Sequence, residues 1–103
     1  HFCIFDELYS GTNPDEAALA GQAFIEYLCE FSNVNFILTT HYFKICSYCK
    51  NHKRIQNYKM DVIVDDNDEF TYTYKIKKGA SKIKGGIRVL KDLNYPSAIL
   101  DKL

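Results

Sequence analysis

A short apolar run that ends in two acidic residues places the strongest constraint on the fold of this chain. Residues 2–5 are Phe-Cys-Ile-Phe, and Asp6 and Glu7 follow directly. A continuous apolar run of mostly β-favouring residues predicts a buried strand. Helical spacing of apolar residues predicts a helix over about 14–31, and residues 35–41 predict a second strand. This order of elements predicts a βαβ unit with two parallel strands and a right-handed crossover.

Candidate functional residues stand at the ends of both predicted strands. Asp6 and Glu7 end the first strand, and His41 ends the second. Ligands of parallel sheets bind beyond the carboxyl ends of the strands, so these side chains are expected to share one crevice. An Asp there can hold Mg²⁺ directly or through water, and the adjacent Glu can orient or deprotonate an attacking water. The alternatives are a solvated strand end and a hydrogen-bonded structural histidine.

The predicted helix has start signals of its own. Thr12 or Asn13 can cap it, and Pro14 suits its first turn. Its predicted apolar face is formed by residues at three- and four-residue spacing, namely Ala20, Ala23, Phe24, Tyr27, Leu28 and Phe31.

The second half of the chain predicts an antiparallel strand pair between helices. The remaining predicted elements are a helix at 42–50, strands at 55–64 and 69–77, and helices at about 85–93 and 97–103. An acidic turn over residues 65–68 joins the two strands. We expect this pair to extend the parallel sheet as an antiparallel addition.

The charges balance overall but are separated along the chain. The 103 residues carry 13 Lys and Arg and 13 Asp and Glu, which argues against a dedicated electrostatic nucleic-acid binder. Residues 1–31 hold six acidic and no basic residues, whereas residues 75–91 hold seven Lys or Arg. Two solvated faces or a surface for a partner or nucleic acid would explain this separation. No apolar run reaches the ~20 residues that span a bilayer, so no membrane association is expected.

The cysteines favour an intracellular protein with reduced thiols. Four cysteines, at positions 3, 29, 46 and 49, are too few for a dense disulfide framework. Cys46, Cys49 and His52 could share one helix face and bind Zn²⁺, but no clear fourth ligand is present. Half-buried structural thiols are the expected alternative.

Aromatic and basic residues alternate in the second strand of the antiparallel pair. Tyr72 and Tyr74, with Lys75 and Lys77, could stack on and contact a nucleic acid. Aromatic residues at a period of two are more often the packed face of a sheet, and this is the expected role here.

Short sequence motifs along nearly the whole chain resemble those of the MutS family of mismatch-repair ATPases. Residues 5–12, Phe-Asp-Glu-Leu-Tyr-Ser-Gly-Thr, resemble the family's DE-L-x-x-G-T segment, and Thr-Thr-His-Tyr at 39–42 resembles its T-T-H-Y/F switch. Further similar motifs occur in the family's order and spacing, at residues 57–60, 70–76 with Gly79, 86–89 and 95–96.

The resemblance implies that residues 1–103 form the carboxyl-terminal part of a MutS-type ATPase domain. The implied fold is an α/β, three-layer P-loop NTPase half-domain of the ABC-ATPase type. Asp6 would serve Mg²⁺, Glu7 would activate water, and His41 would sense the γ-phosphate of ATP. Ser10, Gly11 and Thr12 would complete the nucleotide site, in a loop that faces a second MutS-like subunit. Mismatched or structured DNA would be bound by domains other than this one.

Two departures from the family pattern set the remaining expectations. The sequence opens inside a strand, which predicts that it is a piece of a longer protein. No G-x-x-x-x-G-K-S/T phosphate loop occurs in residues 1–103, which predicts that this piece is inactive by itself. Lys84-Gly85-Gly86 stands where the family usually has Ser-Tyr/Phe-Gly, which predicts a divergent member. The alternative is a non-catalytic, ATPase-derived interaction module that dimerises.

Overall fold

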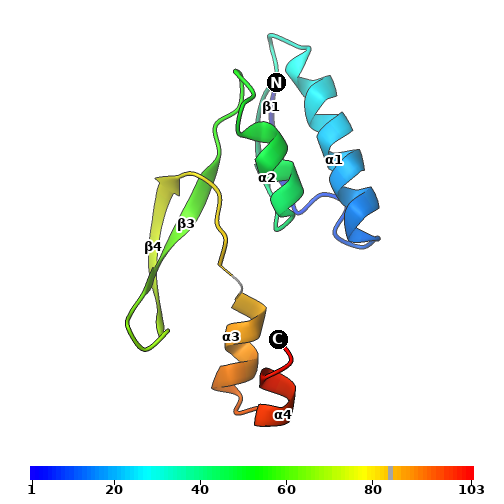
Figure 1. Cartoon of the computed structure of the whole chain (residues 1–103). Helices are drawn as coiled ribbons and strands as arrows, with labels where there is room; N and C mark the ends of the chain where they lie inside the picture. Colours follow the sequence, from blue (N-terminus) through cyan, green and yellow to red (C-terminus); the bar gives the residue numbers. More distant parts are fainter. Residues whose placement is uncertain (84) are drawn as a thin grey trace.

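A parallel strand pair joined by a helix forms the first part of the computed structural model, which describes residues 1–83 and 85–103. The strands are β1 (Phe2–Asp6) and β2 (Asn35–Thr39), and helix α1 (Pro14–Cys29) connects them (Figure 1). Phe2 lies opposite Asn35 and Asp6 lies opposite Thr39. The predicted βαβ unit with parallel strands is therefore confirmed, and its strand ends lie at the same edge.

Helix α1 begins with a side-chain cap. The Oδ1 atom of Asn13 accepts hydrogen bonds from the amides of Asp15 at 2.9 Å and Glu16 at 3.4 Å. Pro14 occupies the first turn, where its missing N–H costs nothing, and the two acidic residues face the positive end of the helix dipole. Of the two predicted caps, the structure uses Asn13.

The core lies between α1 and the short helix α2 (Phe43–Cys49). Its buried members come from both helices and are Ala18, Ile25, Ile45 and Cys49. Phe36 and Leu38 of β2 pack against this cluster. Both helices therefore cover the same face of the β1–β2 sheet (Figure 1).

The predicted apolar face of α1 is only partly right. The helix buries Ala17, Ala18, Gly21, Ile25 and Leu28, so only Leu28 of the predicted set is buried. Tyr27 and Phe31 are 55% and 39% exposed, and their rings pack edge to face on each other with centroids 5.1 Å apart. Three of the five buried residues, Ala17, Ala18 and Gly21, are small, and at Gly21 the missing side chain lets Ile45 of α2 approach closely.

Within the described part of the chain, one face of the β1–β2 sheet is covered and the other is open. Phe2, Ile4 and Ile37 point to the other face and are 63%, 72% and 55% exposed. The expectation of a buried first strand is thus wrong for the described residues. The region of β1, β2, α1 and α2 has one layer of strands and one of helices, not the three layers expected of the whole domain.

An antiparallel hairpin follows, built from β3 (Tyr58–Val64) and β4 (Phe70–Lys78). Its acidic turn is organised by Asp65, whose Oδ1 accepts hydrogen bonds from the amides of Asn67 and Glu69, both at 2.9 Å. The register shifts between Met60 and Val62. The extra residues of β4 include Tyr74, whose φ of 57° is left-handed, so this is a β-bulge.

The hairpin does not extend the parallel sheet, which corrects our expectation. Among the described residues the strands form two separate two-stranded sheets. The connector before β3 explains why. Arg54 donates to the carbonyls of Cys29 and Phe31, and Asn57 Nδ2 donates to the carbonyl of Cys46 at 2.8 Å. These bonds tie the connector to the helices and carry β3 away from the sheet edge. Strand periodicity predicts pairing but does not choose an edge.

The last part of the chain holds α3 (Gly85–Asp92) and α4 (Ser97–Leu100). Pro96 is the N-cap of α4 and no side chain caps it, so the predicted Ser97 cap is wrong, and the helix ends earlier than predicted. Lys84, part of the divergent Lys84-Gly85-Gly86 word, lies outside the described residues.

The whole molecule is elongated. Its extents are 51 × 29 × 21 Å and its radius of gyration is 16.4 Å, compared with about 13 Å for a compact chain of this length. Figure 1 shows the α1–α2 region, the hairpin and α3–α4 as successive parts along this length. No helix in the described residues is both long and apolar enough to cross a bilayer.

Candidate functional site

The candidate site lies at the last residue pair of the β1–β2 sheet. Asp6 and Thr39 are paired there, and the Thr39 hydroxyl donates a 2.6 Å hydrogen bond to Asp6 Oδ1. A bond from a hydroxyl to a carboxylate is short and charge-assisted. The carboxylate of Asp6 is thus anchored at the carboxyl end of the sheet, where the sequence analysis expected it.

Glu7 turns the chain out of the sheet in an unusual conformation. Its φ is 48°, a left-handed value that costs a non-glycine residue energy. Its amide donates to Thr39 at two atoms, the carbonyl oxygen at 3.0 Å and Oγ1 at 3.1 Å. Its Oε1 lies 3.6 Å from Nδ1 of His41, and these side chains are 53% and 58% exposed. The structure therefore places Asp6, Glu7 and His41 at one edge of the sheet, as predicted, and it brings the side chains of Glu7 and His41 close together.

The loop after β1 carries the other predicted nucleotide-site residues. Tyr9 has a φ of 62°, and its carbonyl accepts a 3.3 Å hydrogen bond from the Tyr42 hydroxyl. The amide of Ser10 donates to the carbonyl of Glu7 at 3.2 Å. Ser10, Gly11 and Thr12 are exposed, and no described hydrogen bond joins their side chains to the carboxylates or to His41. The loop thus adjoins the site without entering its hydrogen-bond network.

The donors at the strand ends suit Mg²⁺ that is held jointly with phosphates. Asp6 and Glu7 offer hard carboxylate oxygens, which Mg²⁺ prefers, and usually one or two carboxylates plus substrate phosphates hold this ion. The described residues contain no group of three or more His, Cys, Asp or Glu that could form an all-protein cage. The carboxylate oxygens of Asp6 and Glu7 are thus donors of the kind that Mg²⁺ prefers.

The possible zinc ligands are used for packing. Cys49 lies in the core, and burial raises the pKa of its thiol to about 11. Burial also raises the pKa of Cys46, so both thiols favour the protonated form over the thiolate that binds metal. The Nδ1 atom of His52 accepts a hydrogen bond from the amide of Arg54 at 3.1 Å. All four cysteines are free thiols.

The tyrosines of the hairpin are not packed as expected. Tyr72 is 54% exposed and Tyr74 is 85% exposed, because the bulge turns the strand at that point. Lys77 forms an ion pair with Asp61 at 3.2 Å, so one of the two nearby lysines is neutralised within the hairpin.

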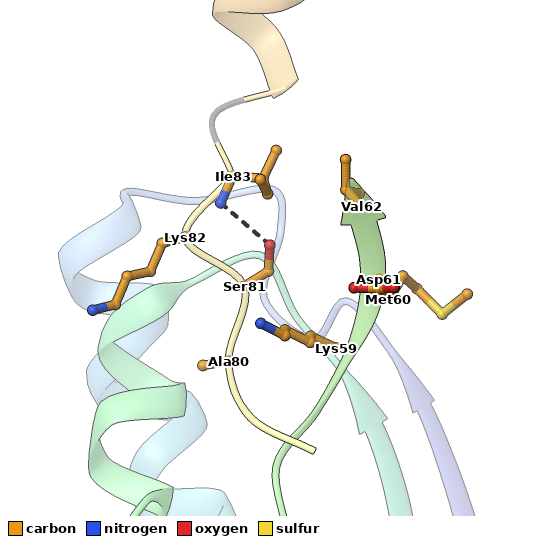
Figure 2. Close-up of a pocket in the computed structure, with 8 residues that line it drawn as sticks. All are labelled: Lys59, Met60, Asp61, Val62, Ala80, Ser81, Lys82 and Ile83. Atoms are coloured by element: carbon orange, nitrogen blue, oxygen red, sulfur yellow. Dashed lines mark hydrogen bonds between the residues drawn. The ribbon is translucent and has the colours of Figure 1, made fainter. Parts of the chain in front are cut away.

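A separate cavity lies beside the hairpin. Its volume is about 330 Å³, and residues 59–62 of β3 and residues 80–83 line it. Figure 2 shows Lys59 and Met60 on opposite sides of the strand, as the alternation of a strand requires. None of the predicted site residues lines this cavity.

Sequence reasoning missed the contributions of Thr39 and Tyr42. Both belong to the Thr-Thr-His-Tyr motif, but each contributes through a hydrogen bond to a residue more than 30 positions earlier in the chain. The pairing of Asp6 with Thr39 could have been inferred once the strand register was known. The Tyr42 contact carries no local sequence signal.

Comparison with known proteins agrees with these features. The family model described as MutS domain V matches residues 1–103. Proteins named DNA mismatch repair protein MutS, from Prochlorococcus marinus (strain MIT 9312) and Staphylococcus epidermidis, are each 31% identical to the chain over 100 and 102 residues. The corresponding protein of Leuconostoc citreum is 28% identical over 98 residues.

The matched region is a small part of these relatives. The alignments cover 95–96% of this chain but only 11% of the length of each relative. The match of the family model over the whole chain nevertheless settles the family. The chain belongs to the MutS domain V family.

Proposed function

We propose that this chain is the carboxyl-terminal part of the ATPase domain of a MutS-like DNA mismatch-repair protein. Asp6 holds the Mg²⁺ of bound ATP, Glu7 orients or deprotonates the attacking water, and His41 donates to the γ-phosphate. The observation that supports the proposal is the position of these three residues at one sheet edge, where Glu7 Oε1 lies 3.6 Å from His41 Nδ1. The names of the relatives support the repair context.

The roles follow from the chemistry of each group. Phosphoryl transfer is catalysed mainly by positioning and by electrostatic stabilisation of the transferring group. Bound Mg²⁺ would neutralise charge that develops on the phosphate oxygens. The chain's own residues hold that ion at Asp6, accept a proton at Glu7, and supply an imidazole N–H from His41. The loop at Ser10, Gly11 and Thr12 lies beside them, at the start of α1, where it can contact nucleotide or a second subunit (Figure 1).

Substitution of Glu7 tests the proposal. Glu7→Gln keeps the size of the side chain but removes the base, so hydrolysis by the intact protein should fall by about 10²-fold or more. ATP binding should persist, because Asp6 is unchanged. Phosphate release and nucleotide binding are measured side by side, with Glu16→Gln in the first turn of α1 as the matched control. Wild-type turnover by Glu7→Gln would remove the catalytic role.

A second candidate, a non-catalytic module that dimerises, is favoured by one observation. Large apolar side chains are exposed on β1–β2, on the hairpin and on the last helices, for example Ile4, Ile76 and Val89. Such surfaces mark interfaces. Under the leading proposal the same surfaces contact the rest of the domain and a second MutS-like subunit. A protein that dimerises yet neither binds nor hydrolyses ATP would support the second candidate.

A further inference from the structure

We infer that Thr39 is a positioning residue that sets both acidic residues of the site, the carboxylate of Asp6 and the backbone of Glu7. The inference rests on the proposed ATPase function, because it assigns a role at that same site. Thr39 itself is not assigned to contact nucleotide or Mg²⁺. It acts through two hydrogen bonds made by one hydroxyl group.

The direction of both hydrogen bonds is fixed by chemistry. A hydroxyl has a single proton and two acceptor lone pairs. A carboxylate can only accept, so the Thr39 proton points to Asp6 Oδ1 at 2.6 Å. An amide can only donate, so the Glu7 N–H at 3.1 Å occupies a lone pair of the same oxygen. One side chain therefore links the two acids and fixes their relative placement.

The bond to Asp6 orients its carboxylate. Oδ1 is held by Thr39, while Oδ2 has no partner among the described hydrogen bonds and stays available for a cation. Groups that orient a metal ligand without touching the metal typically change metal affinity or activity 10–100-fold when removed. Thr39 would act in this way on the Mg²⁺ proposed at Asp6, because it orients the carboxylate without contacting the ion.

The bond to Glu7 supports a strained backbone. Left-handed conformations of non-glycine residues persist only where their surroundings hold them, and Glu7 has a φ of 48°. Its amide is shared between the carbonyl and the hydroxyl of Thr39. The carbonyl is present in any residue at position 39, whereas the hydroxyl is not. A Thr39→Val substitution keeps the shape and the carbonyl bond and removes only the hydroxyl bonds.

The neighbouring threonine offers a matched control. The Oγ1 atom of Thr40 accepts a 3.0 Å hydrogen bond from the amide of Tyr42, at the entrance to α2. Thr40→Val therefore removes a hydroxyl of the same kind from the next position without touching the bonds to Asp6 and Glu7. Thr39→Ser supplies the rescue variant, because it restores the hydroxyl.

The experiment uses the intact protein and two readouts besides turnover. The first is the Mg²⁺ concentration that gives half-maximal binding of a fluorescent ATP analogue, and the second is the exchange rate of the Glu7 amide. Thr39→Val should raise the half-maximal Mg²⁺ concentration about tenfold or more and speed Glu7 exchange. Thr39→Ser should restore both values, and Thr40→Val should leave both as in the wild type.

The outcomes separate this inference from the proposed function. If Glu7→Gln abolishes turnover while Thr39→Val leaves the Mg²⁺ dependence and the amide exchange unchanged, the ATPase stands and the role of Thr39 is overturned. Equal behaviour of Thr39→Ser and Thr39→Val also overturns it. If the intact protein binds no nucleotide, the proposed function fails, and the exchange rate of the Glu7 amide alone decides whether Thr39 positions that residue.

Discussion

Gly21 of α1 faces Ile45 of α2 so closely that a Cβ at Gly21 would lie 2.7 Å from Ile45 Cδ1. Real Cβ contacts are longer, so one of the two side chains would have to move. Ile45 is only 3% exposed and has little room to do so. The close approach of the two helices therefore depends on a residue with no side chain.

Gly21→Ala should destabilise the domain by about 1 kcal/mol. Overpacking costs about 1–3 kcal/mol and outweighs the gain of about 1 kcal/mol in helix propensity. Ile45→Val removes Cδ1, the clashing atom, and alone should cost about 1 kcal/mol. The double variant should be more stable than the sum of the two single changes predicts. Stability is measured by urea denaturation of the intact protein, and amide exchange of α1 gives the local readout. Strict additivity would contradict the contact.

Arg88 should hold α3 against the tip of the hairpin. Its side chain is only 14% exposed, donates to the carbonyl of Asp68 at 2.7 Å and pairs with Glu69 and, at 2.9 Å, with Asp92. It also lies over the ring of Phe70, 5.7 Å from the centroid.

Arg88→Lys cannot reproduce this arrangement, because an ammonium group lacks the planar fork of the guanidinium. Amide exchange in α3 should become about tenfold faster, the equivalent of one lost hydrogen bond to a charged group. Lys91→Met, an exposed change on the same helix, is the control and should leave exchange unchanged. Equal protection in Arg88→Lys and the wild type would show that α3 is held by other contacts.

Cys49 should make the domain sensitive to alkaline pH. Burial raises the pKa of its thiol from an ordinary 9.0 to about 11, so the folded state favours the proton more than the unfolded state does. The stabilisation is then complete below pH 9 and is lost as the pH rises through 11. The Tyr48 hydroxyl, whose pKa its hydrogen bond to Glu26 raises to about 12, acts in the same direction at still higher pH.

Cys49→Ala isolates the thiol from the tyrosine. The variant should be less stable at pH 7 because it leaves a cavity, but its stability should fall less between pH 9 and 11 than that of the wild type. Stability is measured by urea denaturation at each pH. Parallel curves for the two proteins would contradict the assignment.

Under the proposed function, substitutions of Asp6 and of His41 should affect nucleotide binding and turnover differently. Asp6→Asn should weaken Mg²⁺-dependent nucleotide binding at least about tenfold, because the proposed cation ligand loses its charge. His41→Ala should leave binding nearly intact and slow turnover about tenfold or more, because a donor to the transferring phosphate is lost. Nucleotide titrations and steady-state phosphate release distinguish the two, with His52→Ala as the control. Identical defects in both variants would contradict the separate roles.

The sequence by itself determined the local structure and the contents of the site. The helix and strand segments, the cap at the start of α1 and the acidic turn at 65–68 depend on near neighbours, and each appears close to where it was predicted. The parallel pairing also followed, since a helix between two strands allows few other topologies. With that pairing, Asp6, Glu7 and His41 had to meet at one edge.

Only the tertiary structure decided which surfaces pack and how the site is held. The stripe of α1 that is buried depends on the fit of Gly21 to Ile45, and the separation of the hairpin depends on the bonds of Arg54 and Asn57. The double hydrogen bond of Thr39 requires the strand register. All of these are contacts between distant positions, whose geometry no local pattern encodes.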